Sequence, residues 1–294
     1  MANLKELRNR IASVKNTRKI TAAMSQIAAA RLRKAQDAVI AAKPYGDRMR
    51  DVIESLVGGI DPAERAAAHP LLATRKVERE LLIVLTADRG LCGGFNSNIV
   101  RATLAHIDER RREGVTVEVV AIGKKAVSSL RHAKVPLRAS HDAPTLATLV
   151  TLSKTVIADA IAAFGAKPGE RFDAVRLLFN EFVSMLSQKV HNVPMIPLVP
   201  GETAGAGARE PSYEPSRAVI LEHLVALAIE ARLQQAMFNS IAAEIAARRV
   251  AMDAATDNAT EMIADLTLVY NRERQAAITK ELMEIIGGAE SLKG

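Results

Sequence analysis

The chain has 294 residues, no tryptophan and an aromatic content of only 3%. Because aromatic side chains usually dominate the burial of large cores, this composition argues against two large domains and favours one mid-sized domain with extended helices. The single cysteine, Cys92, excludes an internal disulfide, and the formal charge of +7 favours acidic partners.

The first fifty residues carry the basic excess, with twelve Lys or Arg against three acidic residues. Residues 2–43 contain no Pro or Gly, which predicts a helix about 60 Å long. Pro44 should kink or interrupt this helix, and Gly58 should end it.

The apolar residues of this first helix fall on two faces when each residue is turned by about 100°. Four share one face and three lie nearly opposite: Leu4, Leu7, Ile11 and Val14, then Ile20, Met24 and Ile27. Supercoil drift is too small to produce this switch, so the helix should meet one neighbour at its start and another surface farther along.

The central part of the chain alternates strands and helices. Residues 80–86 form a short aliphatic run typical of a strand buried on both faces, and a glycine-rich turn follows at 88–94. The further elements that we expect are helices at 96–112, 124–132 and 145–164, strands at 115–122 and 174–182, and a Pro-rich edge segment at 189–199. This succession predicts an open α/β sheet with parallel strands.

The C-terminal part predicts the longest helix, since residues 216–286 contain no Pro or Gly. Its apolar residues recur every three or four positions over about seven heptads, which is typical of a coiled coil. The main seam positions are Leu224, Leu227, Phe238, Ile241, Ile245, Met252, Met262 and Leu266. Only Gln234 and Arg248 interrupt the pattern, and a guanidinium in a seam should point toward an acidic partner or snorkel into solvent.

The predicted fold class is therefore α plus α/β: an antiparallel coiled coil of the N- and C-terminal helices with an inserted open-sheet, Rossmann-like domain. The expected segments are a helix at 1–57, a linker at 58–77, the α/β domain at 78–200, a linker at 201–214 and a helix at 215–294.

No convincing active site is apparent. The loop around Gly90 lacks the GxGxxG spacing of a dinucleotide site, and no P-loop motif occurs, so its glycines are better explained by a tight turn. Cys92 has no identifiable base, and the six histidines are scattered. We expect no catalytic residue, no metal and no cofactor.

Three motifs resemble the gamma-subunit family of F-type ATP synthases. They are Ile11–Thr21 with Arg31–Gln36, the loop Asp88–Asn96, and the terminal stretch Ile278–Ser291; Val250–Asn258 adds to the match. The resemblance implies a non-catalytic central-stalk rotor, present as one copy in a complex with alpha, beta, epsilon and c subunits. The resemblance further implies that such a rotor couples proton flow through the c ring to ATP synthesis or hydrolysis at the beta subunits.

The resemblance also implies contact residues. Met24, Arg248, Gln275, Thr279 and Glu281 match positions that face the ring of alpha and beta subunits, and Tyr213 and Glu214 match the foot that meets epsilon and the c ring. The local charge near Met24 departs from many family members, which have Lys where this chain has Ala22.

Two other function classes remain open from the residues alone. A coiled-coil nucleic-acid binder would use the basic arm on phosphates, although that arm lacks interleaved aromatic residues. A nucleotide-dependent α/β enzyme would use the loop around Gly90.

The opening residues show no apolar signal region, and no apolar run approaches the twenty residues that a membrane span needs. For a family member we therefore expect a peripheral position on the cytoplasmic side of a bacterial inner membrane, held there indirectly through the c ring.

Overall fold

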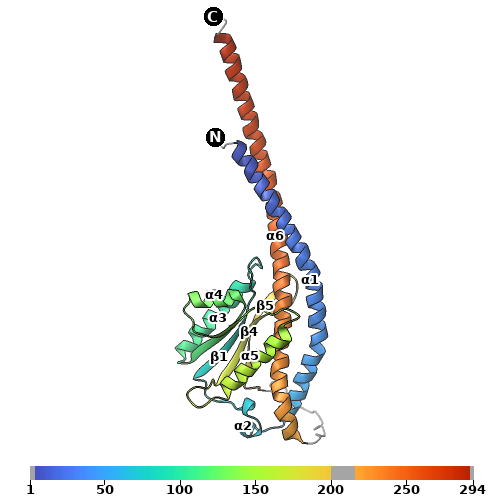
Figure 1. Ribbon diagram of the computed structural model, residues 1–294, viewed down its shortest axis with the longest axis vertical. Helices are drawn as coiled ribbons and strands as arrows, with labels where there is room; N and C mark the ends of the chain where they lie inside the picture. Colours follow the sequence, from blue (N-terminus) through green and yellow to red (C-terminus); the bar gives the residue numbers. More distant parts are fainter. Residues whose placement is uncertain (1–3, 200–215, 292–294) are drawn as a thin grey trace. The chain divides into compact units, whose positions relative to one another are not determined.

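The computed structural model describes residues 4–199 and 216–291 (Figure 1). The helices are α1 (Leu4–Gly58), α2 (Arg65–Ala68), the 3-10 helix η1 (Pro70–Leu72), α3 (Phe95–Arg112), α4 (Lys124–His132), α5 (Leu149–Phe164) and α6 (Arg217–Ser291). The strands are β1 (Arg79–Leu85), β2 (Thr116–Ile122), β3 (Leu137–His141), β4 (Ala174–Phe182) and β5 (Gln188–Ile196). No helix among these residues combines the length and apolar character needed to cross a bilayer.

The chain divides into two compact units. The first joins Met1–Ala28 to Arg249–Gly294, and the second comprises Ala29–Arg248. Both α1 and α6 contribute to each unit, so the two terminal helices are partners in both.

The second unit contains a five-stranded sheet in the order β3-β2-β1-β4-β5. β1 pairs in parallel with β2 and with β4, while β5 runs antiparallel to β4 at the edge. The predicted parallel α/β sheet and the edge position of the Pro-rich strand are confirmed. β3, which has only five residues, was not predicted from the sequence.

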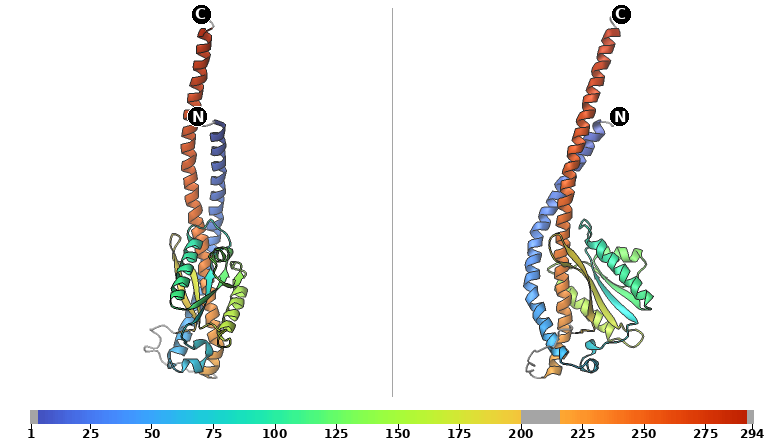
Figure 2. Two further views of the ribbon diagram at one scale, coloured as in Figure 1. Left: turned by 90° about the vertical axis from the view of Figure 1, so that its left-hand side faces the viewer. Right: turned by 180° about the vertical axis from the view of Figure 1, so that it is seen from behind.

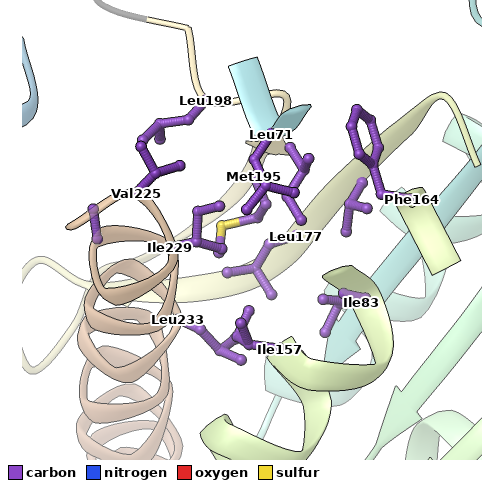
Figure 3. Close-up of a cluster of buried hydrophobic side chains, with 14 of the residues drawn as sticks. Leu71, Ile83, Ile157, Phe164, Leu177, Met195, Leu198, Val225, Ile229 and Leu233 are labelled. Atoms are coloured by element: carbon purple, nitrogen blue, oxygen red, sulfur yellow. The ribbon is translucent and has the colours of Figure 1, made fainter. Parts of the chain in front are cut away.

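Helices cover both faces of this sheet, with α3 and α4 on one face and α5 with α6 on the other (Figure 2). Figure 3 shows side chains from α5, the sheet, η1 and α6 meeting in one cluster, including Ile83, Ile157 and Leu177. Val225, Ile229 and Leu233 of α6 are part of it, so this stretch of α6 belongs to the core of the α/β unit as well as to a helix pair.

Within the second unit, α1 and α6 pack antiparallel. Gly46 of α1 lies beside the side chain of Gln235, and the Leu56 carbonyl accepts a hydrogen bond from Arg217 Nε over 3.1 Å. Residue numbers therefore fall along α6 as they rise along α1. The predicted antiparallel pairing of the terminal helices is confirmed.

Within the first unit, the same antiparallel pairing uses small polar side chains. Thr21 Oγ1 lies 2.7 Å from Thr256 Oγ1, and Ser25 donates a hydrogen bond to Asp253. The buried face that begins at Leu7 therefore continues through hydroxyl groups instead of through large apolar side chains.

Two isoleucines of α1 lie on a different face from this contact. Ile20 and Ile27 are 60% and 54% exposed in the chain, whereas Leu7 on the other apolar face is buried. The separation into two apolar faces is confirmed, and the second surface expected to meet Ile20 and Ile27 stays a prediction.

Of the kink or interruption expected at Pro44, the interruption does not occur, because α1 runs through Pro44 to Gly58. Proline removes one backbone donor, but Pro44 is exposed, and buried residues on both sides, such as Ala35 and Ile53, hold the flanking turns in place. The segment at 58–77 is not only a linker either, because it contains α2 and η1, and Leu71 and Leu72 of η1 are buried.

Candidate functional site at the glycine loop

The glycine loop (residues 88–94) follows the carboxyl end of β1, the strand that pairs with β2 on one side and β4 on the other. In open α/β sheets, ligands commonly bind at this position, where the strand order reverses. The loop is therefore the first place to look for a functional site, and what surrounds it decides what the site can do.

Helix α6 fills the space beside this loop. Ala243 and Ala247 are buried against Cys92 and Phe95, and Phe182 at the end of β4 packs against the same cluster. Alanine lets the helix backbone approach closely because its side chain is a single methyl group. The crevice in which a Rossmann-like fold would hold a ligand is thus occupied by the protein's own helix.

Arg248 ties α6 to the loop backbone. Its Nη1 donates to the Gly90 carbonyl over 2.7 Å, and its Nε donates to Glu244 Oε1 over 3.1 Å. Its side chain is only 16% exposed, and a guanidinium at that depth needs such partners. The acidic partner expected for Arg248 is thus found one turn earlier on the same helix, with the loop carbonyl as a second acceptor.

The loop's own carboxylate occupies the start of α4. Asp88 Oδ1 accepts from the backbone amides of Lys124 over 2.9 Å and Ala143 over 3.0 Å. Thr86 Oγ1 accepts from the Ala126 amide over 2.9 Å. Helix N-termini favour anions, and here the Asp88 carboxylate caps the start of α4. These contacts support a tight structural turn and give no support to a phosphate cradle.

Cys92 is positioned as a packing residue. It is buried, and Asn96 Nδ2 donates to its sulfur over 3.1 Å. Burial raises the pKa of the Cys92 thiol, and the nearby carboxylate of Glu244 acts in the same direction. The thiol is therefore held in its neutral form, which is a poor nucleophile.

The predicted seam residues of α6 have different surroundings. Met252 is buried, Leu224 and Phe238 are partly buried against the core of the second unit, and Ile241, Ile245 and Leu266 are half-buried. Leu227 and Met262 are 45% and 47% exposed, so in the chain by itself these two are not buried positions.

The fully buried face of α6 contains residues that were not among the predicted seam positions. They are Val225, Ile229, Leu233, Met237, Ala242, Ala243 and Ala246. The reason is that α6 packs against both α1 and the α/β unit, which buries a wider arc than a two-stranded seam. The two alanine pairs at 242–243 and 246–247 were the available signal in the sequence, because small residues mark close helix contacts.

Four of the remaining predicted contact residues belong to the first unit. Met24 is half-buried on α1, while Gln275, Thr279 and Glu281 are exposed on α6, where Thr279 Oγ1 donates to the Gln275 carbonyl over 2.9 Å. Tyr213 and Glu214 lie outside the described residues.

Comparisons with known proteins agree over the full length of the chain. A family model described as ATP synthase matches residues 3–292. The ATP synthase gamma chain of Geobacter metallireducens is 43% identical over 298 residues, covering 100% of both chains. That of Sinorhizobium medicae is 42% identical and covers 99% of this chain and 100% of its own.

Solved structures show the same fold. A chain of the Euglena gracilis mitochondrial ATP synthase has a TM-score of 0.67 at 20% identity, covering 98% of this chain and 94% of its own. A chain of the Tetrahymena thermophila mitochondrial ATP synthase has a TM-score of 0.57 at 21% identity, covering 80% and 99%. Given the family match and the full-length relatives, this chain belongs to the ATP synthase gamma-chain family.

Proposed function

We propose that this chain is the central-stalk rotor subunit of an F-type ATP synthase. The observation that carries the proposal is the full-length similarity to gamma chains, joined to a fold in which the terminal helices pair antiparallel around an inserted α/β unit. Solved structures with this fold are described as a central stalk with its c ring and as a rotor.

The subunit acts in this proposal without chemistry of its own. The crevice beside the glycine loop is filled by α6, and the buried Cys92 thiol is neutral, which supports a non-catalytic role. ATP synthesis or hydrolysis then takes place at the beta subunits, and proton flow through the c ring turns the stalk.

Rotation can drive catalysis only if the stalk presents different surfaces to equivalent catalytic subunits, because an equilibrium shifts only through differential contact free energy. The uneven first unit supports this: Ile20 and Ile27 are exposed on one helix, while α6 carries a separate apolar set. That set consists of Ile278, Leu282, Met283, Ile285 and Ile286, all exposed in the chain by itself.

The proposed partners are those that the resemblance to the gamma-chain family implies. Met24, Arg248, Gln275, Thr279 and Glu281 would meet the alpha and beta subunits, and Tyr213 and Glu214 would meet epsilon and the c ring. The chain would then sit peripherally on the cytoplasmic side of a bacterial inner membrane, held there through the c ring as one copy per complex.

The experiment that tests the function is reconstitution. The chain is added to alpha and beta subunits of a related bacterial enzyme, and the stoichiometry of the purified complex is measured together with proton-coupled ATP synthesis in vesicles containing the membrane sector. We expect one copy per hexamer and synthesis that depends on the chain. Failure to join the hexamer, or equal synthesis without the chain, would contradict the proposal.

A further inference from the structure

The apolar residues that join α6 to the core of the second unit form a repeat of four residues. All of them are buried in the cluster of which Figure 3 shows a part, and each follows the one before by four positions: Leu221, Val225, Ile229, Leu233 and Met237. The alanines that contact the glycine loop have the same spacing, because Ala243 and Ala247 are also four positions apart. Side chains at this spacing form one ridge along a helix.

A ridge with this repeat fits its groove in more than one register. If α6 moved by four residues toward its own amino end, about 6 Å along its axis, each residue of the ridge would occupy the place of the residue four positions before it. We call this arrangement the shifted register. Ile241 would then take the place of Met237, and Ala251 would take that of Ala247. Because apolar side chains would again fill apolar places, the ridge alone distinguishes poorly between the two registers.

A hydrogen bond between α6 and α5 exists only in the observed register. Gln234 Nε2 donates to Ser153 Oγ over 3.1 Å, and Ser153 is 0% exposed. In the shifted register Phe238 would take the place of Gln234, and its ring has no N–H or O–H group to donate. Since Ser153 has no surface in contact with solvent, water does not replace this contact.

Arg248 makes the second contact that depends on register. Its Nη1 donates to the Gly90 carbonyl over 2.7 Å, and in the shifted register Met252, which cannot donate, would take its place. The shift would also move Glu244 into the buried place of Ser240, where a charge is costly. The polar residues of this stretch thus fit the observed register and not the shifted one.

We propose that Gln234 and Arg248 determine the axial register of α6 on the α/β unit, and that the shifted register is the nearest competing packing of this unit. They are the two residues that interrupt the apolar pattern of α6 in the sequence. A polar contact within an apolar interface can fix register in this way at a cost in stability. Arg217 has a different role, because it bonds to Leu56 and so joins α6 to α1. The inference concerns the chain by itself and stands apart from the proposed rotor function.

The test measures one distance within the second unit of the full-length chain by electron paramagnetic resonance. Spin labels are attached through unnatural amino acids, so that Cys92 stays unchanged, at exposed Ser97 near the start of α3 and at exposed His223 of α6. α6 runs from the cluster around Leu71 toward the glycine loop, so the shift carries His223 away from Ser97 by up to about 6 Å. We expect a single distance in the unmodified chain.

A triple variant of α6 removes the contacts that depend on register. Gln234→Leu, Glu244→Ala and Arg248→Ala leave the apolar ridge intact, and Ser153 keeps its hydrogen bond to the Val150 carbonyl. One hydrogen bond corresponds to about a three- to tenfold change in an equilibrium, so losing two should raise the ratio of shifted to observed register about ten- to a hundredfold. We therefore expect a second, longer distance in the triple variant.

Ala251→Leu is the matched control. It leaves the ridge of the observed register unchanged, but in the shifted register it would place a leucine against Cys92 and Phe95, where Ala247 now packs. Added to the triple variant, it should abolish the longer distance. A single unchanged distance in the triple variant, or a longer distance that persists with Ala251→Leu, would overturn the inference. If the triple variant does not fold, Gln234→Leu alone is measured by the same two criteria.

Discussion

Single residues decide how the glycine loop and α6 are joined. Arg248 is the clearest case, because one guanidinium contacts both the Gly90 carbonyl and the Glu244 carboxylate. In the sequence, Arg248 appears only as an interruption of the apolar seam. Its hydrogen-bond acceptor, the Gly90 carbonyl, is distant in the sequence, so the spacing of residues along α6 could not predict this contact.

Replacing Arg248 by Ala should destabilise the isolated chain. The change removes the hydrogen bond to Gly90 and leaves Glu244 without this cation, and hydrogen bonds to charged groups contribute about 1.5–3 kcal/mol each. Urea unfolding of the isolated chain measures the effect without any partner subunit. Arg274→Ala, at an exposed position of the same helix, serves as the control, and equal midpoints for the two variants would count against the contact.

Glu80 should make the stability of the chain depend on pH in the acid range. Burial acts to raise the pKa of Glu80, but hydrogen bonds with His106 and Arg110 outweigh it and lower that pKa in the folded state. The stabilising contribution of Glu80 is therefore present above the pKa of the unfolded chain, about 4.3, and is lost as the pH falls below that value. Glu80→Gln should flatten this part of the stability curve measured by denaturant unfolding. Glu78→Gln, at an exposed neighbouring position, should retain the slope of the unmodified chain.

At the scale of elements, α6 serves two kinds of packing. In the second unit its large apolar residues join the core beneath the sheet, and its alanines contact the glycine loop. The pattern of a two-stranded coiled coil predicts neither the packing against the sheet nor the contact with the glycine loop. For this reason the predicted seam contains Leu227, which is exposed, and lacks Ala243, which is buried.

Enlarging Ala243 should separate α6 from the loop. Ala243→Leu adds three carbon atoms at a position that is buried against Cys92 and Phe95, and overpacking of this kind costs about 1–3 kcal/mol. Ala218→Leu, at an exposed position of the same helix, should have little effect. Thermal unfolding measures both variants, and an unchanged melting temperature for Ala243→Leu would mean that the contact is loose.

Much of the fold could be read from the sequence because its signals are local. The buried strand β1, the edge strand β5 and the helix α4 each follow from a short run of residues. β3 was missed because Leu137–His141 is short and mixes polar with apolar residues, so neither strand pattern stands out. The contacts of Glu80 with His106 and Arg110 could not be found either, since they join residues of separate elements.

At the scale of the whole chain, two compact units share the same two helices. The second unit has a large apolar core, whereas α1 and α6 in the first unit meet through Thr21, Ser25, Asp253 and Thr256. The stability of the second unit should therefore not depend on the end of α6.

Removing residues 275–294 should leave the α/β unit folded but weaken assembly or coupling of the complex. The deleted segment contributes exposed apolar side chains and no buried residue among those described. Near-ultraviolet circular dichroism reports the fold, and proton-driven synthesis reports coupling. A full-length variant with Ile278, Leu282 and Ile285 changed to Ala separates loss of apolar contact from loss of length; undiminished synthesis by both variants would refute a role for this end.

The contact between alanines of α6 and the glycine loop has a mechanical consequence. Ala243 has no side-chain torsion that could rotate to absorb a movement, and it is packed against the buried side chains of Cys92 and Phe95, while Arg248 donates a hydrogen bond to the Gly90 carbonyl. We therefore expect that a small rotation of this stretch of α6 would also displace the glycine loop.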